Sequence, residues 1–395
     1  MNDVLLEAPV SHFVIKMKEL KKIVLIGPVY PYKGGISHYT SLMYRALNKK
    51  YDVTMVSYKM QYPKILFKKE QKDYSNDTFR IDGTNYWIHT ANPFNLVSAA
   101  RKIRAEKPNL IIIQWWHPYF APCYWILSKL LRKTQILFVC HNVFPHERFP
   151  MDRFLTKLVL KQGDCFITHS KKDADDLLSI EPDARYIQTV LPTYNVFKFE
   201  DMSHEDARKK LNLSKTERTL LFFGFVREYK GLKHLLRAMP LLKETDLNIK
   251  LLIVGDFGDD KQDYLDLINE LNIADMLEIH AGYIPDREIE KYFAASDLVV
   301  LPYESATQSA IVQIAYGFEK PVIVTRVGGL PDVVADGKTG YITEPGNPAD
   351  LAKAIQRYFQ EEKESEFREG IKQEAYKYSW ERMAEHIELL YGDAE

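Results

Sequence analysis

The stretch TLLFFGFVREYKGLKHLLRAMPLL, residues 219–242, places an apolar run directly before a helical pattern. TLLFF is typical of a strand that is buried on both faces, and LKHLLRAMPLL repeats its apolar residues at helical spacing. Between them, GFVREYKG sets Arg227 and Lys230 where the strand ends and the helix begins. A strand followed by a helix in this way is the repeating unit of parallel, doubly wound sheets.

The same unit recurs along most of the chain. Apolar runs that indicate strands occur in the first half at 22–27, 51–58, 108–114, 135–142 and 165–170. They recur in the second half at 219–224, 249–256, 277–284, 297–303, 321–326 and 340–344, with helical patterns between them. This alternation predicts an α/β protein with a parallel sheet in each half.

At residues 189–203, Pro, Tyr and Asn interrupt the spacing of apolar residues that is typical of helices and strands. We therefore expect the linker between two domains there. The predicted division is an N-terminal extension (1–20), two Rossmann-like domains (21–195 and 196–375) and a last helix (376–395). A chain of 395 residues is longer than a single hydrophobic core usually accommodates, so two domains are expected. We expect the last helix to cross back to the first domain.

The composition is that of an ordinary globular protein, with 46% hydrophobic and 27% charged residues. Three cysteines, Cys123, Cys140 and Cys165, form no CxxC pair, and their odd number favours a reducing compartment over a disulfide framework. We therefore expect a cytoplasmic protein without a bound metal. No run of about 18 apolar residues, the length needed to cross a bilayer, occurs in the sequence.

The net charge of −1 hides an asymmetry between the halves. Residues 1–198 carry 29 Lys and Arg against 17 Asp and Glu, a net charge of +12, and the remainder carries 24 against 37, a net charge of −13. One interpretation is that the first half meets an anionic surface or acceptor. The other is that two oppositely charged domains attract each other.

Arg227 and Lys230 have the placement of an anion site. Ligands of doubly wound sheets bind at the carboxyl ends of the strands. Cations there, beside the positive end of a helix, would suit a pyrophosphate. The alternative is that both side chains are solvated surface charges.

A second candidate is the loop PVYPYKGGISHYT, residues 28–40, with Gly34 and Gly35 between the first strand and its helix. Glycines let backbone amides approach a phosphate or sugar closely, although a tight turn would also explain them. The loop lacks the GxGxxG and GKS/GKT patterns, which disfavours hydride transfer and ATP hydrolysis.

The segment LPYESATQSAIVQIAYGFEKPVIVTRVGGLPDVVADGKTGYI, residues 301–342, is the most specific in the chain. Polar residues follow the strand DLVVLPY, and a helix that starts near Ser309 would aim its first amides at the same space as Lys230. Gln313 lies one turn further along that helix and is expected to face a ribose.

The aromatic stretch QWWHPYFAPCYWIL, residues 114–127, carries the acceptor-side candidates Trp115, Trp116 and His117. These rings could stack on a saccharide or lie at a membrane interface, or they could be core packing behind a strand end. With basic pieces such as KILFKKEQK (64–72), they favour a lipid-linked or cell-envelope acceptor on an anionic membrane surface, and no nucleic acid partner is expected.

The second half resembles the donor domain of retaining nucleotide-sugar glycosyltransferases of family 4, which have the GT-B fold of two facing Rossmann-like domains. The matching pieces are G224-x5-K230-G231, AYGFEKPVIVT and VGGLPDVVADGKTGYI. The loop with Gly34-Gly35 and the pair His141-Asn142 resemble the acceptor domain. The resemblance covers most of residues 21–392.

The resemblance implies roles for individual residues. Arg227 and Lys230 correspond to the pair that holds the donor pyrophosphate, although Arg227 stands two places later than the family's arginine. His141 corresponds to the histidine that touches the donor sugar. Of the family's two glutamates, the second falls on Gln313 and the first on Ser305, next to Glu304. The donor-binding residues expected in this way are Gly34, Gly35, Gly224, Tyr283, Ser305, Thr307, Gln308, Ser309, Ala310 and Gln313, and Asn142 joins the acceptor side.

The resemblance therefore implies a cytoplasmic, metal-independent, retaining glycosyltransferase, peripheral on the inner membrane leaflet. It would move a sugar from a UDP- or GDP-sugar, its substrate rather than a cofactor, to a glycan or lipid-linked acceptor. The missing glutamates motivate an alternative, a catalytically weak scaffold that binds nucleotide sugar. A GT-B sugar-nucleotide epimerase or phosphorylase is a further alternative.

Overall fold

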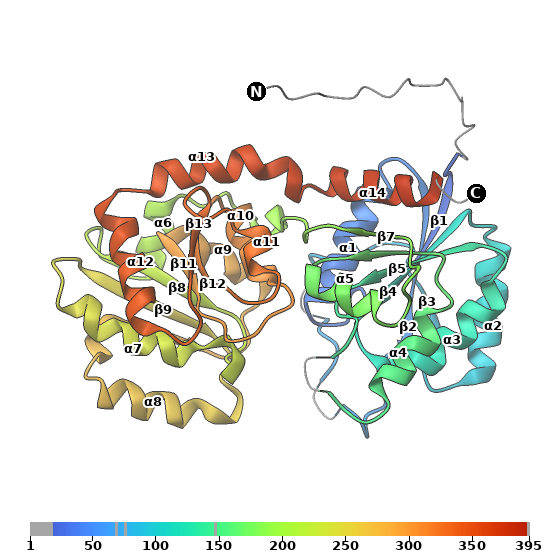
Figure 1. Cartoon of the computed structure of the whole chain (residues 1–395), viewed down its shortest axis with the longest axis horizontal. Helices are drawn as coiled ribbons and strands as arrows, with labels where there is room; N and C mark the ends of the chain where they lie inside the picture. Colours follow the sequence, from blue (N-terminus) through green and yellow to red (C-terminus); the bar gives the residue numbers. More distant parts are fainter. Residues whose placement is uncertain (1–18, 68–69, 75–76, 146–147, 393–395) are drawn as a thin grey trace, which may run out of the picture.

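The computed structural model describes residues 19–67, 70–74, 77–145 and 148–392, so the predicted N-terminal extension lies almost entirely outside the described residues. Two parallel β-sheets stand side by side, each flanked by helices (Figure 1). This is the predicted fold class. None of the described helices is both long and apolar enough to cross a bilayer.

The first sheet has the strand order β3-β2-β1-β4-β5-β6-β7. Its strands are β1 (Lys22–Ile26), β2 (Asp52–Met60), β3 (Asn85–His89), β4 (Leu110–Trp115), β5 (Gln135–Cys140), β6 (Cys165–Thr168) and β7 (Tyr186–Gln188), and all pair in parallel. All six residues of the central strand β4, LIIIQW, are buried, as expected for a sheet covered on both faces.

The second sheet has the order β10-β9-β8-β11-β12-β13 and is also parallel throughout. Its strands are β8 (Arg218–Phe223), β9 (Ile249–Gly255), β10 (Leu277–Ala281), β11 (Leu298–Leu301), β12 (Val322–Thr325) and β13 (Gly340–Thr343). All six coincide with strands predicted from the sequence. The two edge strands β3 and β7 were not predicted, because their mostly half-buried residues produce no continuous apolar run.

Helices cover both sheets. The first half contains α1 (Gly35–Leu47), α2 (Pro93–Ala105), α3 (Ala121–Leu131), α4 (Asp152–Leu160) and α5 (Lys171–Leu178). The second half contains α6 (His204–Lys210), α7 (Leu232–Lys243), α8 (Lys261–Glu270), α9 (Asp286–Ala295), α10 (Ala310–Gly317), α11 (Leu330–Val333), α12 (Pro348–Gln360), α13 (Glu364–Glu374) and α14 (Trp380–Gly392). Helices α2, α3 and α4 pack side by side as one outer layer of the first domain.

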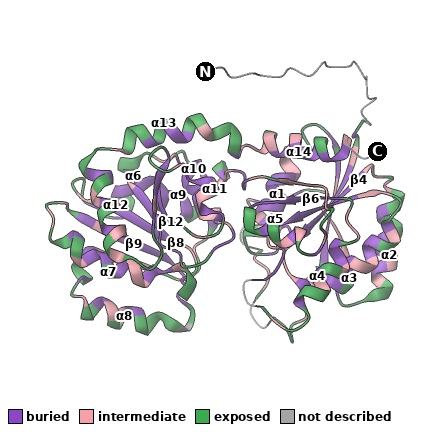
Figure 2. Cartoon of the chain, in the orientation of Figure 1, coloured by how far each residue is buried: buried purple, intermediate pink, exposed green. Residues whose placement is uncertain are grey.

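Between β7 and α6 the chain carries only the 3-10 helix Asn195–Phe197, within the stretch predicted to be the linker. The domain limits at residues 195 and 375 stay a prediction. Figure 2 shows buried residues concentrated on the strands of both sheets, and one cluster of buried side chains includes residues from both halves. The two domains therefore share apolar contacts.

The C-terminal helix crosses back to the first domain, as predicted. In Figure 1, α13 runs along the second domain and α14 lies over α1. The Nζ of Lys50 lies 2.6 Å from Glu388 Oε1, and the side-chain amide of Gln135 donates to the Leu390 carbonyl at 3.0 Å. The last helix thus packs against the first domain after α13 has run along the second.

Candidate active site

Glycines form the carboxyl edge of the second sheet. Gly224 follows β8, Gly255 ends β9 and Gly282 follows β10, and all three have positive φ, at 106°, 148° and 120°. A Cβ on Gly255 would lie only 2.6 Å from the Gly224 carbonyl carbon. Gly224 and Gly282 are half-buried and carry no side chain, so a ligand at this edge can approach their backbone, whereas Gly255 is buried against Gly224.

Lys230 lies at this edge, as predicted from the sequence. Its Nζ is 3.2 Å from the position that a Gly224 Cβ would take, and 5.7 Å from the centre of the Tyr303 ring. Burial, aided by the positive charge of Arg227, lowers the pKa of Lys230. Among the described residues, no carboxylate forms an ion pair with it. A half-buried ammonium group without an acid partner favours binding of an anion.

Arg227 is more exposed than Lys230. Its Nη1 donates to the Val226 carbonyl at 3.2 Å and lies 2.9 Å from the position that a Gly258 Cβ would take. The guanidinium therefore lies beside the loop after β9, at the same edge of the sheet. The structure thus brings both cations to the strand ends, with Lys230 on the inner side.

Helix α10 begins at Ala310, as predicted, with Ser309 as its N-cap. The Ser309 side chain makes no capping hydrogen bond, and Ile311 lies 3.7 Å from the Gly224 Cβ position. The contact is made by the Ile311 side chain, so the first turn of α10 faces Gly224, which Lys230 also contacts. A phosphate site typically combines cations, accessible backbone amides and a helix N-terminus. All three are found at this glycine edge, the strand ends that carry Gly224, Gly255 and Gly282.

The loop before α10 makes contacts other than those expected. The Thr307 hydroxyl donates to Asn142 Oδ1 at 2.6 Å, and the Gln308 amide donates to the His169 carbonyl. Both partners follow strands of the first sheet. In this structure, Thr307, Gln308 and Asn142 thus hold the two domains together, rather than standing free for a sugar.

The residues at the two glutamate positions are not free acids facing Lys230. Gln313 is 0% exposed, and neither polar atom of its side chain has a partner among the described residues. A ribose could reach it only if neighbouring side chains moved. Ser305 is exposed, and Glu304 Oε1 lies 2.7 Å from His234 Nε2 on α7. The Glu304 carboxylate is therefore occupied by a neighbouring histidine.

His141 follows β5 and faces a small polar cluster. Its Nε2 lies 2.7 Å from Gln114 Oε1, and its ring meets the Tyr39 ring edge-on at 4.6 Å. Burial and the neighbouring His169 lower the pKa of His141 well below its usual value, and burial lowers the pKa of His169 to about 3. Both imidazoles are neutral near pH 7, so His141 is suited to hydrogen bonding rather than to proton donation as an imidazolium.

Gly34, Gly35 and Trp116 come together around a cavity of about 240 Å³ in the first domain. No heavy atom lies within 4 Å of the Cβ position of either glycine. The Trp116 indole donates to the Tyr62 hydroxyl at 3.1 Å, and Tyr62 and Phe67 add aromatic walls. Such a cavity, with an aromatic side and an exposed backbone side, has the make-up of a saccharide site.

Trp115 and His117 do not line this cavity. Trp115 is 0% exposed and its indole donates to the Val143 carbonyl at 3.2 Å, so its ring has no face available for stacking on a sugar. The expectation that Trp115 stacks on the acceptor is therefore wrong, and the residue belongs to the apolar core. The His117 Nδ1 accepts from the Tyr119 amide at 3.0 Å and caps the 3-10 helix Pro118–Phe120. Trp115 is the last residue of β4, whereas Trp116 follows the strand and packs, partly buried, against the same apolar cluster.

Contacts that the sequence does not indicate connect the domains beside the cavity. The Lys33 ammonium lies 5.3 Å from the centre of the Tyr283 ring, and His38 Nε2 lies 3.2 Å from Asp286 Oδ2. Lys33 could have been noticed as a cation next to Gly34. The pairing of His38 with Asp286 could not, because the two residues are far apart in the chain.

Comparisons with known proteins agree with this geometry. The family described as "Glycosyl transferases group 1" matches residues 203–378, and "Glycosyltransferase Family 4" matches residues 33–190. D-inositol 3-phosphate glycosyltransferase of Corynebacterium kroppenstedtii is 25% identical over 61% of this chain and 56% of its own length. This chain thus spans just over half of that relative. N-acetyl-alpha-D-glucosaminyl L-malate synthase of Bacillus anthracis is 25% identical over 82% of this chain and 85% of its own.

Among solved structures, HepE of Anabaena in complex with UDP-glucose superposes with a TM-score of 0.69. The match covers 93% of this chain and 99% of that chain at 16% sequence identity. At this identity the likeness shows a shared fold.

Proposed function

The chain belongs to the group 1 and family 4 glycosyltransferases, and from this premise we propose which sugar transfer it performs. It moves a sugar from a UDP- or GDP-sugar to a glycan or lipid-linked acceptor and retains the anomeric configuration. The donor lies at the carboxyl edge of the second sheet, and the acceptor sugar lies in the cavity of Gly34, Gly35 and Trp116.

One observation carries the proposal: the half-buried ammonium of Lys230 stands at a glycine edge, close to the start of α10 and without a carboxylate partner among the described residues. An ammonium placed there stabilises the charge that grows on the β-phosphate as the nucleoside diphosphate leaves. Arg227 supplies a second, more exposed charge. The UDP-glucose complex of HepE makes UDP-glucose the first donor to test.

In the proposed reaction the bond between the anomeric carbon and the β-phosphate oxygen breaks. The acceptor hydroxyl forms its new bond to that carbon on the same face, and its proton passes to the leaving diphosphate. No enzyme carboxylate has to act as a nucleophile, which suits a site in which Glu304 is held by His234. We propose that His141, which is neutral because burial lowers its pKa, hydrogen-bonds the donor sugar rather than protonating it.

Glu304 is paired with His234, and Gln313 is buried. These two observations favour one other function, a scaffold that binds nucleotide sugar without efficient transfer. A sugar-nucleotide epimerase would instead react without a second saccharide. Turnover separates the three functions: the transferase consumes donor only with an acceptor, the scaffold consumes none, and the epimerase consumes donor alone.

The proposal is tested by a thermal-shift panel of UDP, GDP and their sugars, followed by NMR analysis of the transfer product. Because a ligand that binds only the folded state raises Tm by mass action, one nucleotide series should raise it selectively. The transferred sugar should keep the donor's anomeric configuration. An inverted product, or no shift with any nucleotide, contradicts the assignment.

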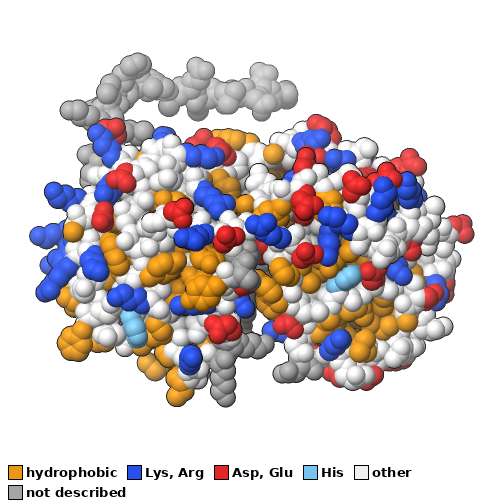
Figure 3. Space-filling model, turned by 180° about the vertical axis from the view of Figure 1, so that it is seen from behind, with side chains coloured by type: hydrophobic (Ala, Val, Ile, Leu, Met, Phe, Trp, Pro, Cys, Tyr) orange, Lys and Arg blue, Asp and Glu red, His pale blue; other side chains and the backbone are white. Residues whose placement is uncertain are grey.

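We also propose that the outer helix layer of the first domain meets an anionic membrane. Figure 3 shows Lys and Arg side chains along the outer edge of this domain. Arg101, Lys102 and Arg104 on α2 are exposed, and Phe94 at the start of α2 is 86% exposed. Cations on the same exposed helix as an exposed aromatic ring suit the surface of a bilayer with anionic lipids.

The protein is expected to pellet with phosphatidylglycerol vesicles at physiological salt and to stay in the supernatant with phosphatidylcholine vesicles. Because each basic residue near such a surface contributes about 1 kcal/mol, Arg101→Ala/Arg104→Ala should weaken vesicle binding roughly 30-fold. Lys49→Ala/Lys353→Ala removes the same charge from exposed positions elsewhere and should bind like the wild type. Equal pelleting with both lipids would refute a charge-directed contact.

A further inference from the structure

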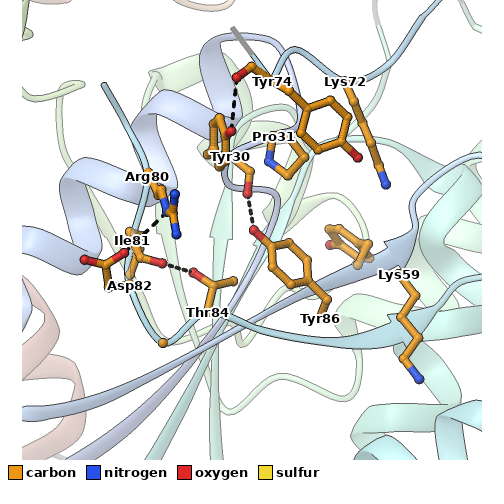
Figure 4. Close-up of a pocket in the computed structure, with 12 residues that line it drawn as sticks. Tyr30, Pro31, Lys59, Lys72, Tyr74, Arg80, Ile81, Asp82, Thr84 and Tyr86 are labelled. Atoms are coloured by element: carbon orange, nitrogen blue, oxygen red, sulfur yellow. Dashed lines mark hydrogen bonds and ion pairs between the residues drawn. The ribbon is translucent and has the colours of Figure 1, made fainter. Parts of the chain in front are cut away.

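A larger cavity lies in the first domain beside the proposed acceptor site. Its volume is about 590 Å³, it is open to solvent, and it is lined by the loop after β1, the end of β2 and the segment that leads into β3 (Figure 4). Nothing in the proposed donor site uses it. Its lining is rich in tyrosines and cations: Tyr30, Tyr58, Tyr74, Tyr86, Lys59, Lys72 and Arg80, with Asp82 as its one carboxylate among the described residues.

The charges of this cavity are unbalanced. Among the described residues, no carboxylate lies within ion-pair distance of the Lys59 or Lys72 ammonium groups. Arg80 Nε lies 3.3 Å from Asp82 Oδ1, and both side chains are largely exposed, so this pair binds weakly. Figure 4 places Lys59 and Lys72 on one side of the cavity and Arg80 with Asp82 on the other. The side with Lys59 and Lys72 is therefore free to receive an anion.

Hydrogen bonds hold the aromatic walls in position before any ligand binds. The Tyr86 hydroxyl donates to the Tyr30 carbonyl, and the Tyr30 hydroxyl donates to the Tyr74 carbonyl at 3.2 Å. The Tyr30 and Tyr74 rings meet edge-on with centroids 6.4 Å apart. Three segments of the chain are thus fixed against one another. Tyr58 is fully buried, whereas Tyr30, Tyr74 and Tyr86 are partly or fully exposed and offer apolar ring surface to a sugar or a lipid tail.

The cavity adjoins the proposed acceptor site through shared backbone. The Lys33 amide donates to the Gln71 carbonyl at 3.0 Å, and Tyr32 forms an antiparallel bridge with Lys72. Lys33 and Gln71 line the acceptor cavity, whereas Lys72 lines the larger one. The two cavities therefore lie on either side of one pair of bridged segments, within reach of a single elongated acceptor.

We propose that this cavity binds the phosphate or diphosphate group of the acceptor, through Lys59 and Lys72, while the tyrosines hold the adjoining sugar or lipid. The inference rests on the proposed function, because it needs an acceptor in the first domain. The acceptor is thus a phosphorylated one, which a sugar kinase or a phosphoglycosyl transfer onto a lipid phosphate would have to supply.

The test is calorimetric titration of the full chain with three probes in the presence of saturating UDP, which fills the proposed donor site. Glucose 1-phosphate represents a soluble phosphate, geranyl diphosphate a lipid diphosphate, and methyl glucoside an uncharged sugar. Lys59→Ala/Lys72→Ala should bind at least one charged probe about tenfold more weakly than the wild type. The affinities for UDP and methyl glucoside should be unchanged, and the unchanged UDP affinity shows that the variant is folded.

The matched control is Lys49→Ala/Lys353→Ala, in which Lys49 precedes β2 whereas Lys59 lies near its end. The control should bind every probe like the wild type. If the double variant binds glucose 1-phosphate more weakly than the wild type, the acceptor is soluble. If it binds only geranyl diphosphate more weakly, the acceptor is lipid-linked. Charged probes that bind the double variant as tightly as the wild type, or fail to bind the wild type, overturn the inference. A wild type that does not bind UDP contradicts the proposed function instead.

Discussion

Replacing Lys230 with methionine is expected to lower kcat for sugar transfer about 10²–10³-fold, the usual effect of removing one group aimed at a developing negative charge. Methionine keeps most of the apolar stem of the side chain and removes only its charge. Because burial lowers the pKa of Lys230 in the unliganded protein, the wild-type ammonium is destabilised until a diphosphate pairs with it. The measurement is the initial rate of donor consumption with saturating acceptor.

Lys233→Met is the matched control for this experiment. Lys233 lies on α7, three residues beyond Lys230, and its ammonium pairs with Glu228 at 3.6 Å on the surface. We expect its rate to stay within about twofold of the wild type, because exposed pairs of this kind contribute little. Equal rates for Lys230→Met and Lys233→Met would show that the ammonium at 230 plays no part in the chemistry.

Gly255→Ala is expected to abolish nucleotide binding and to destabilise the second domain. The residue has φ of 148°, and its new Cβ would lie 2.6 Å from the Gly224 carbonyl carbon, so β8 and β9 would have to separate at the donor site. Backbone strain and overpacking together should lower the free energy of unfolding by at least about 2 kcal/mol. Urea denaturation measures the stability, and titration with UDP measures the binding.

Gly35→Ala serves as the control for stability. Gly35 is the first residue of α1, and nothing lies within 4 Å of its Cβ position. Since alanine also favours the helix, this variant should unfold at the same urea concentration as the wild type or at a slightly higher one. A Gly255→Ala protein that is as stable as Gly35→Ala and binds UDP normally would contradict the assigned role of the glycine edge.

Much of the fold follows from local pattern alone. The six strands of the second sheet are short apolar runs between helices, and each was placed within a few residues of its observed position. Gly224, Lys230 and the start of α10 follow from the same reasoning, because each lies directly after a strand. The strands β3 and β7 were not predicted in this way, because NYWIH and YIQ are mostly half-buried and form no continuous apolar run.

The parts of the site that depend on contacts between the domains could not be predicted. Thr307 and Gln308 are expected near the donor, yet they bond to Asn142 and to the His169 backbone of the first domain. The sequence shows that these two side chains are polar. It does not show whether their partner is a ligand or a residue of the other domain.

The central claim is that a nucleoside diphosphate binds at the glycine edge of the second sheet, held by Lys230, Arg227 and the first amides of α10. A crystal structure of the protein with UDP tests it most directly. We expect diphosphate oxygens at hydrogen-bond distance, about 2.7–3.2 Å, from Lys230 Nζ and from backbone amides near Ser309. A diphosphate bound elsewhere, with Lys230 left unpaired, would contradict it.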